Sequence, residues 1–354
     1  MIDVAVSGRF KSVSQPTGTH RSAALLLAAV KRLTPLTVEA CLPSGHAASS
    51  RRLALAAWEH VWEQFVFPYE TQANVLLSLL GTGPVLHRRR SHCMVVHDLN
   101  YAIVPHVYGI AFRTWYRFAC GLAAQRADVV VCFTNYVSGT IQKRLGIPAD
   151  RIRVVPQGPG LTGLDKPLES PRPQTPARPY FLCVGSLQPH KNLARVLAAW
   201  EMFSQKHGGY SLKVVGRAQG NFASLGLDLS KLPREVGFTG YLSDEELIGL
   251  YRGATGFLYP SIEEGFGLPV VESFYCGCPV ITSNRSCLPE VAGDAAILVD
   301  PHNSAAIAEA MALLAQQSAT AQRLRLRGFE RAKLFTWEKA GRQMASILEE
   351  ASAC

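Results

Sequence analysis

Residues 256–283 read GFLYPSIEEGFGLPVVESFYCGCPVITS and predict a strand, a loop, a helix and a second strand in that order. The apolar run GFLYPS predicts a buried strand, and IEEGFG predicts the loop that follows it. Pro269 suits the first position of a helix, where its missing N–H breaks no hydrogen bond, and Gly277 suits the helix end. A helix between two continuously apolar strands is a βαβ unit, so this stretch predicts a parallel, doubly wound sheet.

The loop of this stretch also has the composition of a ligand site. Glu264 and Glu272 bracket seven residues, and a pair of acids can hydrolyse a sugar bond. The glycines favour a phosphate ligand instead, because they let backbone N–H groups approach an anion at a helix N-terminus. These residue types alone leave both interpretations open. The candidate site residues of the stretch are Glu264, Gly265, Phe266, Gly267, Leu268 and Glu272.

Strand-like apolar runs alternate with helical stretches along the whole chain of 354 residues, 48% of them hydrophobic. This length predicts two domains, and a stretch with five prolines, LDKPLESPRPQTPARP, predicts the linker between them. We therefore expect two doubly wound, Rossmann-like α/β domains that face a cleft, with ligands at the carboxyl ends of the strands. The expected parts are a first domain at residues 1–165, a linker at 166–179, a second domain at 180–335, and a C-terminal helix at 336–354 that packs back on the first domain.

The composition predicts a cytoplasmic protein without a membrane span. The apolar run AALLLAAV at residues 23–30 is much shorter than the ~20 residues that a spanning helix needs. The opening MIDVAVSG predicts a first strand and not a signal peptide. The nine cysteines are scattered and include no CxxC pair, so we interpret them as small buried residues.

Positive charge is concentrated in the first half of the chain. Residues 1–168 carry 18 Lys and Arg against 9 Asp and Glu, whereas residues 169–354 carry 18 against 18. Such a half can meet an anionic membrane or a phosphorylated acceptor, and a solvated basic face is the alternative. The half has no recognisable aromatic–basic module, so nucleic acid is not an expected partner.

The segment YGIAFRTWYRFACGLAAQR at residues 108–126 is the strongest candidate for contact with a membrane. It predicts an interfacial helix, and a core helix with two solvated arginines is the alternative. Its relevant side chains are Phe112, Arg113, Trp115, Tyr116, Arg117 and Phe118.

Two further motifs of the second half predict ligand contacts at strand ends. The stretch CVGSLQPHKNLARVLAAW at 183–200 places Gly185 at the end of a strand and Lys191 just before an amphipathic helix, where an ammonium can neutralise a diphosphate. Arg217 follows the next strand and supplies a second cation for the same site. The backbone of Tyr241 and Leu242 precedes another helix start and can hold a flat base.

Two motifs of the first half predict contacts at its own strand ends. The stretch CMVVHDLNY ends a buried strand with His97, and a histidine there can bind a sugar hydroxyl or a developing charge. Gly18 lies near the start of the first helix and allows close approach to a phosphate. A GxGxxG dinucleotide fingerprint is lacking.

Taken together, these motifs resemble the large retaining glycosyltransferase family 4 of GT-B architecture. The resemblance covers nearly the whole chain and is most specific in the two glutamates separated by seven residues. VGSLQPHKN resembles the phosphate-binding loop of that family, and VVHDLNYAIVPHVYG resembles its histidine–aspartate segment. QPTGTHRSA resembles the N-terminal loop of the bacterial polysaccharide branch, which contains many mannosyltransferases.

The resemblance implies a role for each candidate residue. Glu272 would bind the ribose diol of a nucleotide sugar, and His97 would bind a hydroxyl of the donor sugar. Glu264 and the backbone at 266–268 would hold the sugar and the diphosphate, whose charge Lys191 would neutralise. His97, Glu264 and Lys191 are thus the expected catalytic residues. The donor-binding set comprises Gly18, Gly185, Lys191, Arg217, Tyr241, Leu242, Glu264, Gly265, Phe266, Gly267, Leu268 and Glu272.

The same resemblance implies the reaction. We expect a metal-independent, retaining hexosyltransferase without a cofactor that moves mannose, as a first guess from GDP-mannose, to a saccharide or lipid-linked saccharide acceptor in bacterial surface polysaccharide synthesis. The first domain would serve the acceptor and the second the donor, on the inner face of the membrane. A nucleotide-sugar epimerase of similar two-domain fold is the alternative, and a nucleotide-sugar-binding protein without catalysis is a further one.

Overall fold

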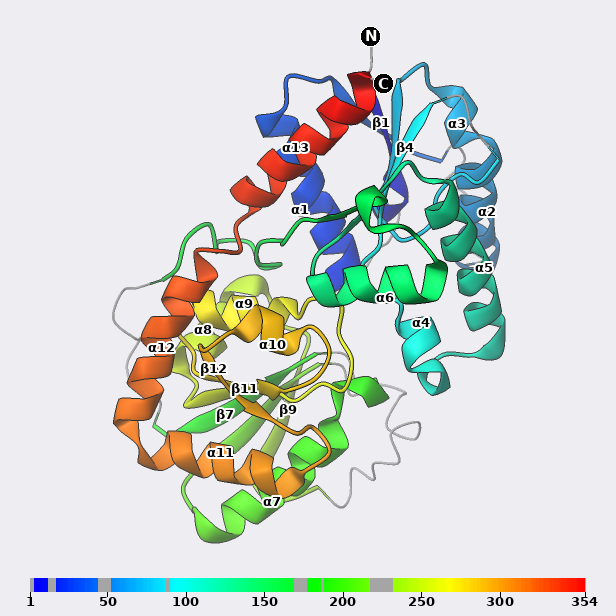
Figure 1. The fold of residues 1–354 in the computed structure, drawn as a ribbon. Coiled ribbons are helices and arrows are strands. Elements are labelled where there is room, and N and C mark those ends of the chain that lie inside the picture. Colours follow the sequence, from blue (N-terminus) through cyan, green and yellow to red (C-terminus); the bar gives the residue numbers. More distant parts are fainter. Residues whose placement is uncertain are drawn as a thin grey trace. The chain divides into compact units, whose positions relative to one another are not determined.

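The computed structural model describes residues 3–11, 17–43, 52–86, 90–168, 177–185, 188–216 and 232–353, with the side chains of 52–57 excepted. It divides into two compact units (Figure 1). The first unit comprises Met1–Gly158 and Trp337–Cys354, and the second comprises Pro159–Thr336. Each unit is built around its own parallel sheet of six strands.

The sheet of the first unit has the strand order β2-β1-β3-β4-β5-β6, with every neighbouring pair parallel. Its strands are β1 (Val4–Ser7), β2 (Val38–Cys41), β3 (Val75–Ser78), β4 (Ser91–Val95), β5 (Val129–Cys132) and β6 (Ile152–Val154). The helices are α1 (Gly18–Leu33), α2 (Arg52–Phe65), α3 (Phe67–Glu70), α4 (Asn100–Ile103), α5 (Ile110–Arg126), α6 (Asn135–Leu145) and α13 (Trp337–Ala353), with short 3-10 helices η1 (Gly8–Lys11), η2 (Pro105–Val107) and η3 (Ala149–Arg151).

The chain returns to the first unit at its C-terminal end. Helix α13 packs along α1, and Gly341 lies so close to this helix that an added Cβ would come within 2.8 Å of the Ala29 Cβ. Met344 and Leu348 of α13 are fully buried. The C-terminal helix is therefore part of the core of the first unit.

The sheet of the second unit has the order β12-β11-β10-β7-β8-β9 and is also parallel throughout. Its strands are β7 (Tyr180–Val184), β8 (Ser211–Val215), β9 (Val236–Gly240), β10 (Gly256–Tyr259), β11 (Val280–Ser283) and β12 (Ala296–Val299). The helices are η4 (Pro189–Lys191), α7 (Leu193–Lys206), α8 (Asp244–Gly253), α9 (Leu268–Tyr275), α10 (Leu288–Ala292), α11 (Ser304–Gln316) and α12 (Ser318–Ala332).

The two layers of helices on this second sheet explain its continuous apolar strands. Helices α7 and α11 lie on one side of the strands, and α8 and α9 lie on the other (Figure 1). Phe181 of β7, Trp200 of α7 and Met311 of α11 are fully buried in one cluster. Both faces of the strands are thus covered, as doubly wound sheets require. The predicted pair of doubly wound α/β units is confirmed.

The boundary between the units differs from the expected one. Residues 159–168 were expected to fall mostly in the first domain, but they belong to the second unit. Their backbone is bonded there: the Gly160 N–H donates to Glu272, the Thr162 N–H to Asp244, and the Leu168 N–H to the carbonyl of Tyr275. The proline-rich stretch is therefore preceded by a segment already anchored to the second unit. Residues 169–176 of the expected linker lie outside the described residues.

None of the helices that the structure describes has both the length and the apolar content needed to span a bilayer.

Candidate functional site

The loops after β7 and β10 are neighbours, because these two strands are hydrogen-bonded at the centre of the second sheet. The first loop carries Lys191 and the second carries Glu264. The Lys191 Nζ donates to both carboxylate oxygens of Glu264, at 2.6 and 2.9 Å, and to the Tyr259 hydroxyl at 2.9 Å. The structure thus joins two expected site residues that are 73 positions apart in the sequence.

The electrostatics of this pair keep the acid ionised. Glu264 is buried, and burial alone would raise its pKa. The Lys191 charge, the neighbouring His190 and hydrogen bonds from Lys191 and Tyr259 outweigh burial and hold the pKa of Glu264 below its usual value. Burial and the Glu264 charge raise the pKa of Tyr259 well above its usual value, so its phenol stays neutral.

Asn192 fixes the position of Lys191. Its backbone is left-handed, with φ of 65°, and it ends the short helix η4 and begins α7. Its side-chain amide donates to the carbonyls of Pro260 at 2.9 Å and Pro301 at 2.6 Å. One buried side chain therefore ties the loops that follow β7, β10 and β12 together. The Ile262 N–H reinforces this connection by donating to the carbonyl of His190 at 2.8 Å.

Glu272 lies on the second turn of α9 and is only 5% exposed. Its Oε1 accepts the Gly160 N–H at 3.1 Å, and its Oε2 lies 3.4 Å from the Tyr251 hydroxyl. A Cβ added at Gly160 would come within 2.8 Å of Oε1, so any other residue here would force the carboxylate to shift. Each carboxylate oxygen has more than one acceptor position, so both can accept further hydrogen bonds from a diol.

The loop between these two acids bends as its glycines predict. Gly267 has φ of 91°, a left-handed value that favours glycine, and it caps the start of α9 without a side chain. Pro269 is the second residue of α9, one position later than predicted. Phe266 is buried against the ring of Phe335 at 5.6 Å between centroids, so its backbone is held in place. Gly265 and Leu268 lie in this same loop and helix start.

The other expected donor-binding residues of the second unit do not lie together in one place. Gly185 lies beside the Lys191 side chain. A Cβ added to Gly185 would be 3.9 Å from the Lys191 Cδ. Tyr241 is 67% exposed, and Leu242 helps to line a cavity of about 480 Å³ with residues of β8, β9 and α8. The capping box that stabilises the start of α8 is formed by Ser243 and Glu246. Arg217 lies outside the described residues.

His97 follows β4 in the first unit, at the carboxyl end of the sheet. Its Nε2 donates to the carbonyl of Leu79 at 2.8 Å, and its ring packs on Phe133. Burial lowers the pKa of His97 to about 4, so the ring is neutral near pH 7 and Nδ1 is an acceptor. Gly18 is the first residue of α1, directly after the capping residue Thr17.

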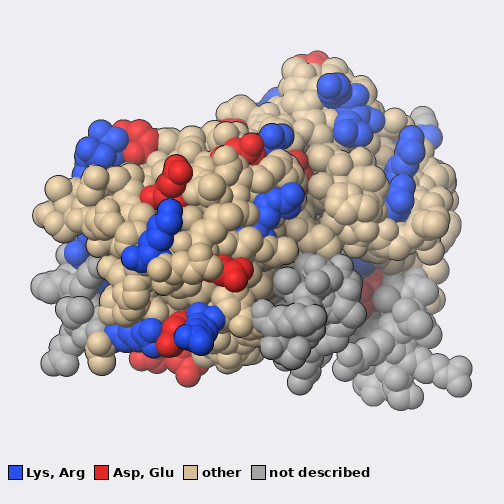
Figure 2. Space-filling model, turned by 90° about the horizontal axis from the view of Figure 1, so that it is seen from below, with Lys and Arg blue, Asp and Glu red and all other residues tan. Residues whose placement is uncertain are grey.

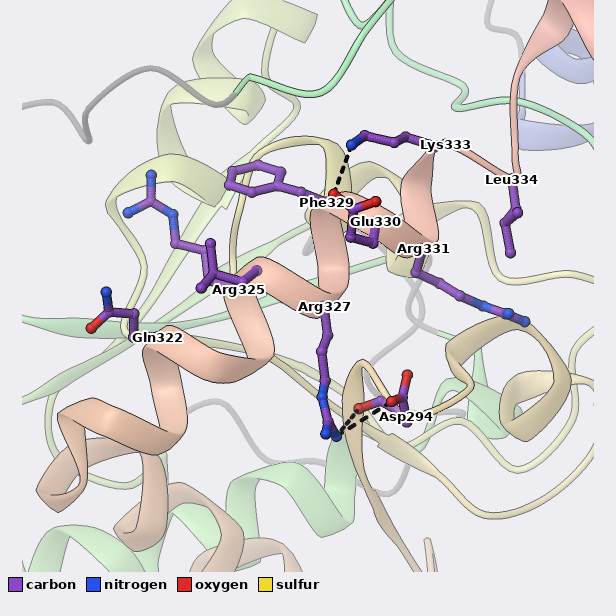
Figure 3. A pocket seen from close by; sticks show the side chains of 10 residues that line it. Asp294, Gln322, Arg325, Arg327, Phe329, Glu330, Arg331, Lys333 and Leu334 are labelled. Atoms are coloured by element: carbon purple, nitrogen blue, oxygen red, sulfur yellow. Dashed lines mark hydrogen bonds and ion pairs between the residues drawn. The ribbon is translucent and has the colours of Figure 1, made fainter.

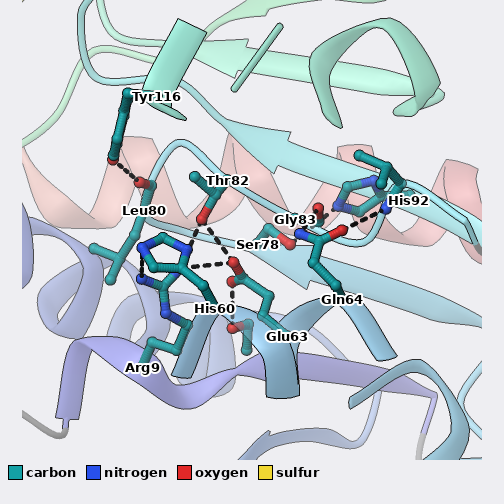
Figure 4. Close-up of polar contacts among 12 residues, drawn as sticks. Arg9, His60, Glu63, Gln64, Ser78, Leu80, Thr82, Gly83, His92 and Tyr116 are labelled. Atoms are coloured by element: carbon teal, nitrogen blue, oxygen red, sulfur yellow. Dashed lines mark hydrogen bonds and ion pairs between the residues drawn. The ribbon is translucent and has the colours of Figure 1, made fainter. Parts of the chain in front are cut away.

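A buried polar network in the first unit was missed by the sequence analysis. It joins Arg9, Glu63 and Thr82, with Arg9 donating to Glu63 at 2.6 Å and to Thr82 at 2.7 Å (Figure 4). The only signals were a single arginine directly after the first strand and one glutamate on the apolar side of a helix. Neither signal identifies a partner, because the three residues come from separate parts of the chain.

A further cavity lies away from the residues discussed so far. It measures about 850 Å³ and lies along α12, where Arg325, Arg327 and Arg331 project in different directions (Figure 3). Arg327 is paired with Asp294 at 3.4 Å, and the Arg331 guanidinium donates to backbone carbonyls of α10. Arg327 and Arg331 therefore hold α12 to α10 and to the turn that follows it. No cluster of His, Cys, Asp and Glu suited to a metal ion occurs among the described residues.

The chain is similar to known transferases. Residues 167–331 match the model of the family described as glycosyl transferases group 1. The O-antigen chain mannosyltransferase B of Escherichia coli is 28% identical over 271 residues, which cover 73% of this chain and 70% of that protein. The O-antigen chain mannosyltransferase RfbU of Salmonella typhimurium is 28% identical over 252 residues, covering 68% and 67%.

A solved structure supports the fold over the full length. Sucrose-phosphate synthase from Thermosynechococcus elongatus superposes with a TM-score of 0.78 at 19% identity, covering 100% of both chains. The family match contains the loop after β7, the loop after β10 and helix α9, which carry Lys191, Glu264 and Glu272. Residues 167–331 of this chain are therefore similar to the family of group 1 glycosyl transferases.

Proposed function

We propose that this protein is a retaining glycosyltransferase that moves a hexose, with mannose as the first candidate, from a nucleoside-diphosphate sugar to a saccharide or lipid-linked saccharide acceptor. The observation that carries the proposal is the arrangement of Lys191, Glu264 and Glu272 around the start of α9. The relatives named as O-antigen mannosyltransferases support mannose and polysaccharide synthesis. GDP-mannose is the corresponding donor to test first.

The proposed donor site uses each group for a separate part of a long ligand. Glu272 accepts hydrogen bonds from the ribose hydroxyls. The backbone N–H groups around Gly267, at the N-terminus of α9, face the diphosphate. Lys191 then binds the diphosphate and stabilises the negative charge that grows as this group leaves. Glu264 keeps Lys191 charge-balanced in its buried position before the donor binds, and afterwards holds the sugar. On this proposal the reaction needs neither a metal ion nor a cofactor.

Transfer is favoured over the alternatives. In the proposed reaction the acceptor hydroxyl attacks the anomeric carbon on the face that the diphosphate leaves, and a phosphate oxygen takes its proton. The bond from the anomeric carbon to the phosphate oxygen breaks as the new glycosidic bond forms, which retains the configuration. Glu264 is committed to Lys191, so a pair of acids acting across one bond, as in a glycosidase, is not supported. The family match favours transfer over epimerisation.

Nucleotide sugars provide the direct test. We expect GDP-mannose to raise the melting temperature of the full chain more than UDP-sugars do, and at 100 times its Kd the gain in unfolding free energy is about 2.7 kcal/mol. Product analysis with and without methyl α-mannoside then separates the reactions. A transferase forms a disaccharide only when the acceptor is present. Conversion of the donor into an epimer without acceptor would refute the proposal.

We further propose that the first unit attaches peripherally to an anionic membrane through the exposed faces of α2 and α5. These helices are in contact, since the rings of His60 on α2 and Trp115 on α5 lie 5.4 Å apart. Tyr116 is an exception to the expected interfacial face, because its hydroxyl turns inward and donates to the carbonyl of Leu80 at 2.8 Å. The exposed large apolar residues of these two helices are Trp58, Val61, Phe65, Ile110, Phe112, Trp115 and Phe118.

The charge that would accompany this apolar face is modest. Arg113 and Arg117 lie on α5, and Lys and Arg on the face drawn in Figure 2 are interspersed with Asp and Glu over much of the surface. Each arginine near an anionic surface contributes about 1 kcal/mol, and salt screens this contribution. Burial of apolar side chains in the membrane must therefore supply most of the binding energy. The arginines would make the protein prefer anionic over neutral lipid.

Sedimentation with liposomes tests this attachment. The full chain is expected to pellet with vesicles of phosphatidylcholine and phosphatidylglycerol, and less so as salt rises. Replacing both Arg113 and Arg117 by Gln should weaken binding roughly 30-fold, because about 2 kcal/mol is lost. Met202→Ser, on an exposed apolar residue of α7, is the matched control and should change nothing. Equal pelleting with neutral vesicles, or none with either, would rule out the anionic membrane.

A further inference from the structure

The polar network of the first unit lies at the carboxyl ends of two neighbouring strands. Arg9 follows β1 and Thr82 follows β3, while Glu63 and His60 project from α2 (Figure 4). Glu63 is only 1% exposed and accepts hydrogen bonds from Arg9, Thr82 and Ser7 at 2.6–2.7 Å. A buried ion pair of this kind contributes little net stability, so its value lies in holding its neighbours in one orientation.

The network determines which nitrogen of His60 carries a proton. The Arg9 Nη2 lies 3.0 Å from the His60 Nε2, and a guanidinium can only donate. Nε2 is therefore the acceptor. Burial, followed by the Arg9 charge, lowers the pKa of His60 to about 4, so the ring is neutral near pH 7 and its single proton is on Nδ1.

The Nδ1–H of His60 is an unsatisfied hydrogen-bond donor. It is shielded from solvent and has no hydrogen-bond partner among the described residues. A buried donor that is left unsatisfied costs about 1–3 kcal/mol and calls for an explanation such as a missing ligand or water. The rings of Trp115 and His60 form a T-shaped pair, with centroids 5.4 Å apart and planes at 81°, and Trp115 remains 42% exposed. A ligand that enters beside this pair meets an exposed indole next to an unsatisfied donor.

The network also shares a loop with His97. Residues 79–83 follow β3, and His97 donates to the carbonyl of Leu79 at one end of this segment. At the other end, Thr82 bonds to Arg9 and Glu63, and Gln64 donates to the carbonyl of Gly83 at 2.6 Å. His97 therefore contacts this segment directly, whereas His60 is connected to it through Arg9 and Thr82. A ligand beside His60 would lie at the same carboxyl edge of the sheet as His97, the residue expected to contact the transferred sugar.

The charges around His60 argue against an anionic ligand. Arg9 is balanced by Glu63, to which it is bonded, and Glu59 adds another acid that acts on the nearby His20. His60 itself is neutral. The charged groups that act on His60 are thus Arg9 and Glu63, whose ion pair leaves no excess positive charge beside the ring to bind a phosphate or a carboxylate. An aromatic face beside a neutral donor suits a sugar ring, which offers apolar C–H groups to the indole and a hydroxyl to the N–H.

We propose that Trp115 and His60 form a subsite for a neutral sugar residue of the acceptor, with the sugar ring against the indole and a sugar hydroxyl accepting a hydrogen bond from the His60 Nδ1. This inference rests on the proposed transferase function, which requires a saccharide acceptor. Arg9 and Glu63 are positioning residues of the subsite, since they act through His60. The subsite excludes the diphosphate of a lipid-linked acceptor, which must lie elsewhere.

Saturation-transfer NMR on the full chain tests the subsite without turnover. The probes are the methyl glycosides of α-mannose, α-glucose, α-galactose and β-N-acetylglucosamine, with mannose 1-phosphate as the anionic competitor. At least one neutral glycoside should show transfer, and Trp115→Ala and His60→Ala should each lower its affinity at least tenfold. His60→Asn should restore binding, because an amide nitrogen can donate from near the Nδ1 position. Tyr69→Ala, on another exposed aromatic residue of this unit, is the matched control.

A measurement of nucleotide binding distinguishes failure of the sugar subsite from failure of the proposed transferase function. Melting shifts with GDP and UDP should be the same in wild type and in the His60 and Trp115 variants, because the residues expected to bind the nucleotide, apart from Gly18, lie in the second unit. If a nucleotide binds but no neutral glycoside does, or the variants bind glycosides as wild type does, the subsite is wrong and the transferase proposal stands. Preference for mannose 1-phosphate would also overturn the subsite. If no nucleotide binds to wild type, the proposed function itself fails.

Discussion

Replacing Lys191 by Ala is expected to lower the turnover of the transferase by about 100- to 1000-fold, the usual cost of losing one donor to a developing negative charge. The Lys191 Nζ is held by Glu264 and Tyr259 within a half-buried loop, so it is preorganised and little reorientation is needed when the diphosphate departs. Because the charge grows in the transition state, kcat should fall more than the affinity for the donor. Steady-state kinetics with GDP-mannose measures the two effects separately.

Controls are needed because the lysine also balances a buried acid. Lys191→Ala leaves the Glu264 carboxylate unpaired, which can destabilise the fold by about 3–5 kcal/mol. The double variant Lys191→Ala with Glu264→Gln removes both charges and should restore the melting temperature while turnover stays low. Lys206→Ala, at the exposed end of α7, is the matched substitution and should keep full activity. A folded Lys191→Ala enzyme with unchanged kcat, or complete loss of wild-type activity in EDTA that magnesium restores, would contradict the mechanism.

Replacing Glu272 by Ala is expected to weaken nucleotide binding by about 2–4 kcal/mol, or roughly 30- to 1000-fold in Kd. Two charge-assisted hydrogen bonds to the ribose are lost, and the effect should appear with the nucleoside diphosphate alone. Isothermal titration calorimetry with GDP and UDP measures it directly. A smaller loss is expected for Glu272→Gln, which keeps an oxygen for the Gly160 N–H.

The matched control for this carboxylate is Glu309→Ala, on the exposed side of α11. This variant should bind nucleotide as the wild type does. Circular dichroism and the melting temperature show whether the Glu272→Ala protein remains folded, since Gly160 and Tyr251 lose their partner. Unchanged nucleotide affinity in a folded Glu272→Ala protein would remove the ribose assignment, although Lys191 could still contact the diphosphate.

The fold was predictable because the local signals agree with one another. The apolar stretch around Val280 has no alternation of inward and outward residues, which is typical of a parallel strand covered on both faces, and β11 is such a strand. Gly267 and Gly277 were expected where the chain bends around a helix, and both have left-handed backbone angles around α9. Such signals depend only on residues that are neighbours in the sequence, so they can be interpreted without knowledge of the rest of the chain.

The pairing within the candidate site was less accessible from the sequence. Lys191 and Glu264 were each expected in the donor site from their place after a strand, but their mutual hydrogen bonds depend on β7 and β10 being neighbours in the sheet. Strand order is a property of the folded sheet and is not encoded in either loop. Asn192 was missed for the same reason, since it bonds to carbonyls of two loops that are remote in sequence.

The first unit shows where such reasoning ends. Arg9, Glu63 and Thr82 have no shared motif, and a single charged residue beside a strand is ordinarily a surface group. Only the folded sheet shows that all three meet in one buried network. The indole of Trp115 illustrates the same limit, because the sequence indicated an amphipathic helix but not the neighbouring helix that carries His60.

The anchoring of residues 159–168 has a consequence for exchanging modules between related enzymes. A hybrid that joins the second unit of this protein, cut at the proline-rich stretch, to the first module of another enzyme would carry that enzyme's residue in place of Gly160. A Cβ at this position would lie 2.8 Å from the Glu272 Oε1, so the buried carboxylate would have to shift. A junction between Gly158 and Pro159 avoids this, because the segment then travels with the helix to which it is bonded. The best junction for recombination therefore lies before the proline-rich stretch that the composition indicates as the boundary. It also lies before residue 167, where the family match begins.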